Sequence, residues 1–181
     1  RGGRNPMRRL LLLRHAKSSW DQRDQEDVQR PLAPRGRQAA PLIGRHLGGQ
    51  GLVPDLVLCS TAERARQTLA LVRAEWDRAD GEGAAVEMRA SLYLAPPGEM
   101  LAALRRLDDA TESVMIIGHN PGMALLAGQL ALKGDPRGLK TMAVKFPTAA
   151  LAVIDFDVDA WRSIAPGRGR LQSFVRPKDL R

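Results

Sequence analysis

The sequence predicts an α/β fold, a three-layer sandwich in which helices cover both faces of a mainly parallel sheet. Short apolar runs alternate with longer amphipathic segments along most of the 181 residues, which is the pattern of strands joined by crossover helices. Near the end of the chain two apolar runs are separated only by residues 157–160, too few for a crossover, so we expect a C-terminal antiparallel hairpin. A chain of this length usually forms one core, and residues 8–181 are predicted to form a single domain.

Strands are expected at residues 9–13, 56–59, 84–88, 114–117 and 151–156, and the hairpin adds a strand at 161–164. Helices are expected at residues 34–47, from Ser60 onward, at 99–107 and at 122–132. The second helix begins with Ser60 and Glu63 in the spacing of a capping box, and the fourth follows Asn120 as its cap and Pro121 at its first position. Residues 79–83 and 133–138 are expected to be loops.

The distribution of charge argues against a nucleic-acid-binding protein. The net charge is +8, but residues 1–9 hold four arginines, and residues 162–181 hold five arginines and Lys178 against Asp179 alone. The rest of the chain is therefore close to neutral and carries no basic face built into the fold. We interpret the basic ends as solvated tails and hypothesise that the C-terminal one guides docking on an acidic phosphoprotein.

Nothing in the sequence indicates a membrane or an exported protein. No apolar stretch approaches the roughly 20 residues of a membrane span, and the run at 10–13 is too short for the apolar part of a secretory signal. The single cysteine, Cys59, lies in an apolar run, which is consistent with a buried thiol in the cytoplasm. Residues 1–7 lack periodicity, and we expect a disordered extension or a remnant of expression there.

Three predicted strands end in polar residues with the same kind of chemistry. Arg14 and His15 follow the first strand, Arg64 lies in the first turn of the helix after the second strand, and His119 follows the strand at 114–117. Each motif alone is also consistent with a surface or structural residue. In open α/β sheets, however, ligands bind outside the carboxyl ends of the strands, so these four side chains are predicted to form one site.

Two arginines and two histidines without an acidic cluster favour a site for a phosphoryl dianion. Arginine binds phosphoryl oxygens in a bidentate manner, and a neutral imidazole can attack phosphorus. No metal and no cofactor is required for this chemistry. Zinc held by His15 and His119 would be repelled by the neighbouring arginines.

These residues resemble the histidine phosphatase superfamily, whose signature is Arg-His-Gly at the first strand end, a second arginine after the next strand and a second histidine later. Here Ala16 stands in the place of the glycine. The closer resemblance is to the SixA-type phosphohistidine phosphatases, and it runs from about residue 8 to Lys178 through segments 14–20, 30–32, 35–36, 60–68, 92–93 and 118–122. It implies a phosphoglycerate mutase-like fold.

The resemblance implies that His15 is the nucleophile and forms a phosphohistidine that water then hydrolyses. Arg14, Arg64 and His119 are the residues that hold the phosphoryl oxygens by the same resemblance. We expect the field of the cationic pocket to keep His15 neutral, because only the neutral ring has a nucleophilic nitrogen.

Further hydrogen bonds to the phosphoryl group are expected from Ser18 and from Asn120 or its backbone amide, whereas Lys17 is expected to face solvent. Aromatic side chains are candidates for a substrate rim, although core packing is the commoner role: Trp20, Tyr93 and Trp161.

Many members of the superfamily carry an acidic residue after the third strand that protonates the leaving oxygen, and none can be assigned here. Glu87 lies within a predicted strand and Glu99 on a helix. Because a phosphoramidate nitrogen can take its proton from solution, the missing acid favours phosphohistidine as the substrate. The predicted function is a phosphatase acting on phosphohistidine in a protein partner or on a small phosphorylated compound. A phosphoglycerate mutase-like phosphotransferase and a non-catalytic phosphate-binding module are the alternatives.

Overall fold

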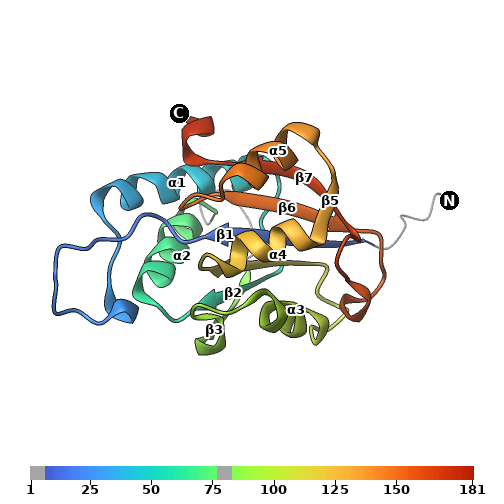
Figure 1. Ribbon diagram of the computed structural model, residues 1–181, viewed down its shortest axis with the longest axis horizontal. Helices are drawn as coiled ribbons and strands as arrows, with labels where there is room; N and C mark the ends of the chain where they lie inside the picture. The colour runs from blue at the N-terminus through green and yellow to red at the C-terminus, as the bar shows by residue number, and fades with distance from the viewer. Residues whose placement is uncertain (1–6, 77–82) are drawn as a thin grey trace.

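The computed structural model describes residues 7–76 and 83–181, and these form a seven-stranded sheet with helices on both faces (Figure 1). The strands are β1 (Arg8–Arg14), β2 (Leu56–Ser60), β3 (Ala85–Arg89), β4 (Ser113–Gly118), β5 (Ala131–Gly134), β6 (Leu151–Phe156) and β7 (Gly169–Val175). The five strands expected before the last one agree to within one residue at each end. The expected extension, apart from Met7, and residues 79–82 of the expected loop lie outside the described residues.

The strand order is β3-β2-β4-β1-β6-β7-β5, and it gathers parallel strands on one side of the sheet. β3, β2, β4 and β1 pair in parallel, so their carboxyl ends lie at one edge. β6 runs antiparallel to both β1 and β7, while β5 is parallel to β7. The sheet is therefore mainly parallel with a C-terminal antiparallel hairpin, as predicted.

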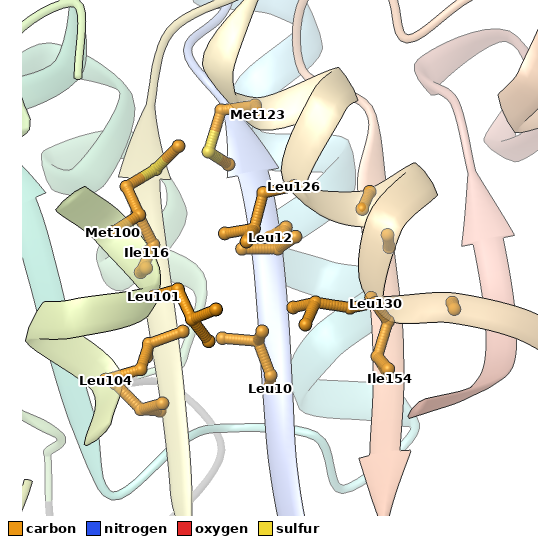
Figure 2. Packing of buried hydrophobic residues seen from close by; sticks show 14 of the residues in the cluster. Leu10, Leu12, Met100, Leu101, Leu104, Ile116, Met123, Leu126, Leu130 and Ile154 are labelled. Carbon is orange, nitrogen blue, oxygen red and sulfur yellow. The ribbon is translucent and has the colours of Figure 1, made fainter. Parts of the chain in front are cut away.

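The central strand β1 is apolar on both faces because both faces are covered. Leu10 and Leu12 pack with residues of α3 (Pro97–Arg105) and α4 (Gly122–Leu130), as Figure 2 shows. Leu11 and Leu13 belong to a second cluster that includes residues of α1 (Pro34–Gly49) and α2 (Glu63–Trp76). All four leucines are fully buried, and burial of each contributes about 1.5–3 kcal/mol. The two clusters are the two interfaces of the three-layer sandwich.

The second strand of the hairpin lies later in the chain than predicted. Residues 161–164 were expected to be this strand, but Trp161–Ser163 form the 3₁₀ turn η4, and the fully buried Trp161 donates from its indole nitrogen to the carbonyl oxygen of Thr111 at 2.6 Å. Trp161 thus fills the core, and β7 takes the place next to β6.

The segment after α4 also differs from the prediction. The helix expected at 122–132 ends at Leu130, and β5 follows at once. The loop expected at 133–138 contains the end of β5 and the start of α5 (Pro136–Val144), whose cap Asp135 accepts a hydrogen bond from the amide of Gly138 at 3.0 Å.

Two predicted helix starts are shifted. Ser60 is the last residue of β2, and α2 begins at Glu63, so Ser60 does not cap that helix. Pro121 occupies the cap position of α4, and the Asn120 side chain accepts from the amide of Ala124 at 3.2 Å.

The basic C-terminal segment is not a free tail. β7 lies between β6 and β5, with Leu171 buried in the core, so the tail interpretation is wrong for residues 169–175. The turn η5 (Pro177–Leu180) that follows packs on α1. Within the described residues, no helix is long and apolar enough to span a membrane.

Candidate active site

The ends of β1, β4 and β2 lie side by side and bring the predicted site residues together. Arg14 is in register with Gly118 on β4, and Ile117 of β4 is in register with Cys59 on β2. His15 and His119 therefore leave the sheet at the same edge, with ring centroids 5.1 Å apart. The three strand ends form one cluster, as the sequence predicts.

His15 is held as a buried, neutral ring with one free nitrogen. Its Nδ1 atom donates to the carbonyl oxygen of Ala16 at 2.7 Å, so Nε2 keeps its lone pair. Burial lowers the pKa of His15 to about 3; the bond to Ala16 opposes this shift, and the charges of His119, Arg64 and Arg14 add to it. We expected the cations to be the main cause, but desolvation is the larger one.

Ala149, two residues before β6, holds the backbone around His15. The amide of Ala149 lies 3.0 Å from the carbonyl oxygen of Arg14 and 3.1 Å from that of His15. Ala149 has a φ of 59°, a left-handed conformation that costs a non-glycine residue of order 1–2 kcal/mol. The strained residue is thus the one whose amide holds the backbone of Arg14 and His15 in place.

His119 is oriented by Ser60, the last residue of β2. The Nε2 atom of His119 and the Oγ atom of Ser60 are 2.7 Å apart, and Ser60 already accepts from the amide of Ala62 at 3.3 Å. The Ser60 hydroxyl can donate to Nε2, and in that arrangement Nδ1 carries the proton of the neutral ring. Burial, followed by the charge of Arg64, lowers the pKa of His119 to about 4.

Arg64 is nearly completely buried and is held through Asp27, which lies on the 3₁₀ turn η1 (Asp27–Gln29). Its two terminal nitrogens donate to the backbone oxygen of Asp27 at 2.7 Å and to its carboxylate at 3.0 Å. The Tyr93 hydroxyl donates to the same carboxylate oxygen, and this bond, ahead of Arg64, lowers the pKa of Asp27. Asp27 is therefore an anion that orients Arg64.

Arg14 reaches the site from the end of β1. Its Nη1 atom donates to the carbonyl oxygen of Phe146 at 3.0 Å. Burial, followed by repulsion from the nearby charge of Arg64, lowers the pKa of Arg14.

The two additional residues predicted to bind the phosphoryl group have protein partners. Ser18 accepts a hydrogen bond from Arg30 at 2.5 Å, and the Asn120 side chain donates to the carbonyl oxygen of Phe146 at 2.9 Å. The serine hydroxyl proton remains available, whereas the Asn120 amide shares an acceptor with Arg14 and supports that residue. Lys17 is exposed, as expected.

Of the aromatic candidates, Tyr93 and Trp20 lie at the site. Tyr93 packs edge-on against His119, with ring centroids 5.4 Å apart. Trp20 is 71% exposed, and its ring carries the guanidinium of Arg30 at 3.4 Å. Tyr93 and Trp20 thus lie beside His119 and Arg30, whereas Trp161 belongs to the core.

Several buried donors at the site have no protein acceptor within the described part of the chain. They are Nε of Arg14, Nη1 of Arg30 and Nε of Arg64, together with Nδ1 of His119 in the tautomer that is protonated there; Nε of Arg30 lies 3.5 Å from the Asp27 carboxylate. Leaving a buried donor unpaired costs about 1–3 kcal/mol, more for a charged group. These donors can pair with the oxygens of an anion.

Comparison with known proteins shows the family of the chain. A family model described as the histidine phosphatase superfamily (branch 1) matches residues 10–90. A solved structure from Nakamurella multipartitia, described as a candidate phosphohistidine phosphatase SixA, is 30% identical with a TM-score of 0.79, and the match covers 94% of this chain and 96% of that one. The chain belongs to the histidine phosphatase superfamily.

Other relatives extend the match over most of the chain. A second structure described as a candidate SixA, from Agrobacterium tumefaciens, is 31% identical with a TM-score of 0.74 and covers 94% of this chain and 98% of that one. An uncharacterised Mycobacterium tuberculosis protein is 36% identical over 168 residues, 92% of this chain and 100% of the relative. Membership in the superfamily and these neighbours support a phosphatase, a hydrolase of phosphoryl groups.

In this histidine phosphatase, alanine replaces the signature glycine without backbone strain. Ala16 is fully buried, and its amide donates to Oγ1 of Thr68 at 3.0 Å. Leu94 and Ala149 are the described non-glycine residues with positive φ, so position 16 does not need glycine's conformational freedom.

Sequence reasoning did not find three members of the site: Asp27, Arg30 and Ser60. Arg30 was part of the resembling segment 30–32 but had no assigned role. Asp27 is one of several acids in a polar loop, which the bridge between Ser18 and Leu32 and the bonds from Arg64 and Tyr93 bring back to the site. Glu87 pairs with Arg89 on β3, so it does not supply the missing acid.

Proposed function

We propose that this phosphatase hydrolyses phosphohistidine in a protein partner, or a small phosphorylated compound, through a phosphohistidine formed on His15. The observation that carries the proposal is the ring of unpaired buried donors on Arg14, Arg30, Arg64 and His119 around a neutral imidazole. A phosphoryl dianion supplies the oxygens that these donors lack.

In the first step, the lone pair of Nε2 of His15 forms a bond to phosphorus. The bond from phosphorus to the leaving atom breaks, and that atom takes a proton. Arg14 and Arg64 bind the equatorial oxygens, where the charge of the transition state is spread, and Nδ1 of His119 donates to another. Burial of His15 keeps the nitrogen unprotonated across the physiological pH range.

In the second step, water forms a bond to phosphorus and the bond to Nε2 of His15 breaks. The water proton goes to solvent, and inorganic phosphate and the neutral imidazole are the products. Nδ1 of His15 donates a hydrogen bond to the carbonyl oxygen of Ala16, and this bond holds the ring in its orientation through both steps.

The site supports a substrate with a good leaving group. Asp27 is the carboxylate in the cluster, but its lowered pKa and its bonds to Arg64 and Tyr93 make it a poor proton donor. A phosphoramidate nitrogen is protonated from solution, whereas an alkyl oxygen needs a positioned acid. A 26% identical structure of the protein histidine phosphatase SixA in complex with tungstate, with a TM-score of 0.73, supports the same substrate chemistry.

The mechanism is tested by acid-quench trapping with a ³²P-labelled phosphoryl donor. Wild-type protein should retain label, and His15→Ala should not. His46→Ala is the matched control, because His46 lies in α1 outside the cluster, and it should label like wild type. Equal turnover by His15→Ala would show that the mechanism is wrong.

The substrate class is tested by comparing a phosphohistidine protein, a phosphoserine peptide and sugar phosphates at equal concentration. Release from phosphohistidine should be the fastest. Preference for the alcohol esters would mean that the site holds a general acid, and Asp27→Asn would then identify it.

A further inference from the structure

A cavity of about 810 Å³ lies beside the catalytic cluster and shares Arg14 with it. Its walls come from the end of β1, the start of α1, the region of α5 and the C-terminal segment. Cationic side chains dominate the lining: Arg14, Lys17, Arg35, Lys140, Lys145, Arg176, Lys178 and Arg181.

The charge of this cavity is unbalanced within the described residues. Eight of its fourteen lining residues are cationic and none is acidic. Of the eight, Arg176 forms a salt bridge to a described residue, Asp179, at 2.8 Å. Side chains of one sign that converge on a hollow repel one another, and a bound anion removes this cost.

The cavity adjoins the phosphoryl site through Arg14. Arg14 lines the cavity and is held by Phe146, while its buried Nε has no protein acceptor. Lys17, two residues after the nucleophile, lies in the same wall. A molecule bound through a phosphoryl group at His15 and Arg14 can therefore extend its remaining part into this basic hollow.

We propose that the cavity binds a second anionic group of a small-molecule substrate, which carries at least two phosphate groups, one of them joined to a leaving group that departs without a positioned acid. The inference rests on the proposed function, because it concerns the part of the substrate that is not transferred. A concave site of this volume is typical of small-molecule pockets, whereas protein docking surfaces are flatter and larger. This favours a polyphosphorylated small molecule over an acidic protein surface.

The first test compares two inhibitors that differ only in the second phosphate, 6-hydroxyhexyl phosphate and 1,6-hexanediol bisphosphate. Both compete with p-nitrophenyl phosphate, and their inhibition constants are measured at fixed ionic strength. The bisphosphate should bind about tenfold tighter or better, the effect of one or two charge-assisted hydrogen bonds. Equal inhibition constants would overturn the proposal.

The second test removes two cavity charges in the double variant Lys140→Gln/Lys145→Gln. Both side chains are exposed, so folding should be retained, and thermal unfolding checks this. The preference for the bisphosphate, measured as the ratio of the two inhibition constants, should fall about tenfold, to a value near one. The control Lys133→Gln/Arg137→Gln removes the same charge from exposed residues outside the cavity lining, and it should keep the wild-type preference. An equal loss of preference in both double variants would mean that the net charge of the protein, and not the cavity, attracts the second phosphate, and it would overturn the proposal.

An acidic protein occupant gives a different result. Hydrolysis of an acidic phosphohistidine protein would then weaken in the cavity variant, while the two hexyl phosphates would bind alike. That outcome would also overturn the small-molecule assignment.

Failure of the proposed function is separable from failure of this inference. If wild type neither turns over p-nitrophenyl phosphate nor labels at His15, calorimetric binding of inorganic tripolyphosphate to wild type and to the two double variants tests the cavity directly. Weaker binding by Lys140→Gln/Lys145→Gln alone supports an anion site in the cavity, and equal binding by all three proteins contradicts it.

Discussion

The Nδ1 atom of His15 lies 2.7 Å from the carbonyl oxygen of Ala16, the residue that takes the place of the signature glycine. A carbonyl oxygen only accepts, so this contact places the ring proton on Nδ1 and leaves the lone pair on Nε2. The backbone of the residue after the nucleophile therefore selects the nitrogen that attacks.

The phosphoryl group should be attached to Nε2 of His15. Two-dimensional ¹H–¹⁵N spectra of phosphoprotein with ¹⁵N-labelled histidine distinguish the two isomers, because the substituted nitrogen loses its lone pair. A phosphoryl group on Nδ1 would contradict the tautomer inferred from the contact with Ala16.

The two buried histidines should make the fold sensitive to mild acid. Their pKa values are about 3 and about 4 in the folded protein, against 6.5 for an ordinary histidine, so below pH 6.5 the unfolded chain binds protons that the folded chain does not. Above that pH the two histidines do not reduce the free energy of unfolding. As the pH drops toward 4, each of them lowers the free energy of unfolding by at most about 1.4 kcal/mol per pH unit. Urea unfolding between about pH 6 and pH 4.5 measures this slope.

The comparison for this prediction is the slope in His15→Gln. Glutamine does not titrate, so the pH dependence should be shallower by up to about 1.4 kcal/mol per unit, whatever the change in stability at neutral pH. An unchanged slope would mean that His15 is protonated in the folded protein.

Asp27 should matter for turnover through Arg64. In Asp27→Ala, Arg64 keeps its bond to the backbone oxygen but loses the carboxylate, and kcat/KM for p-nitrophenyl phosphate should fall about tenfold from loss of positioning. Asp24→Ala removes an exposed acid of the same loop and should stay close to wild type. Equal rates in the two variants would show that Asp27 does not position Arg64.

Most of the site was predictable because its residues are local to strand ends. His15, Arg64 and His119 each follow an apolar run, and the parallel connection of those runs brings their ends to one edge. Asp27 was not predictable in this way. Its position depends on how a polar loop returns across the site, and no periodic pattern records such a return.

The part of the fold that was predicted least well follows α4. The apolar pattern at 122–132 runs without a break from helix into β5, since Leu130 at the end of α4 and Ala131 at the start of β5 are both buried and no proline or glycine separates them. Trp161 is an apolar residue of strand-like sequence, yet it fills the core from a 3₁₀ turn. In both cases tertiary packing, rather than local propensity, decides the structure.

Gly36 should be intolerant of a methyl group although it lies in a helix. A Cβ atom there would lie 2.2 Å from the carbonyl oxygen of Lys17 and 2.9 Å from its amide nitrogen, so the segment that follows His15 would have to move. Gly36→Ala should lower the free energy of unfolding by about 1–3 kcal/mol and also lower kcat/KM, because the displaced backbone carries the nucleophile. Gly128→Ala is the control: in α4 nothing lies within 4 Å of the new methyl group, and the better helix propensity of alanine should raise the free energy of unfolding by about 0.5–1 kcal/mol. Urea unfolding and steady-state kinetics of the two variants check both effects, and a Gly36→Ala protein with wild-type stability and rate would mean that α1 does not hold the segment after His15 in place.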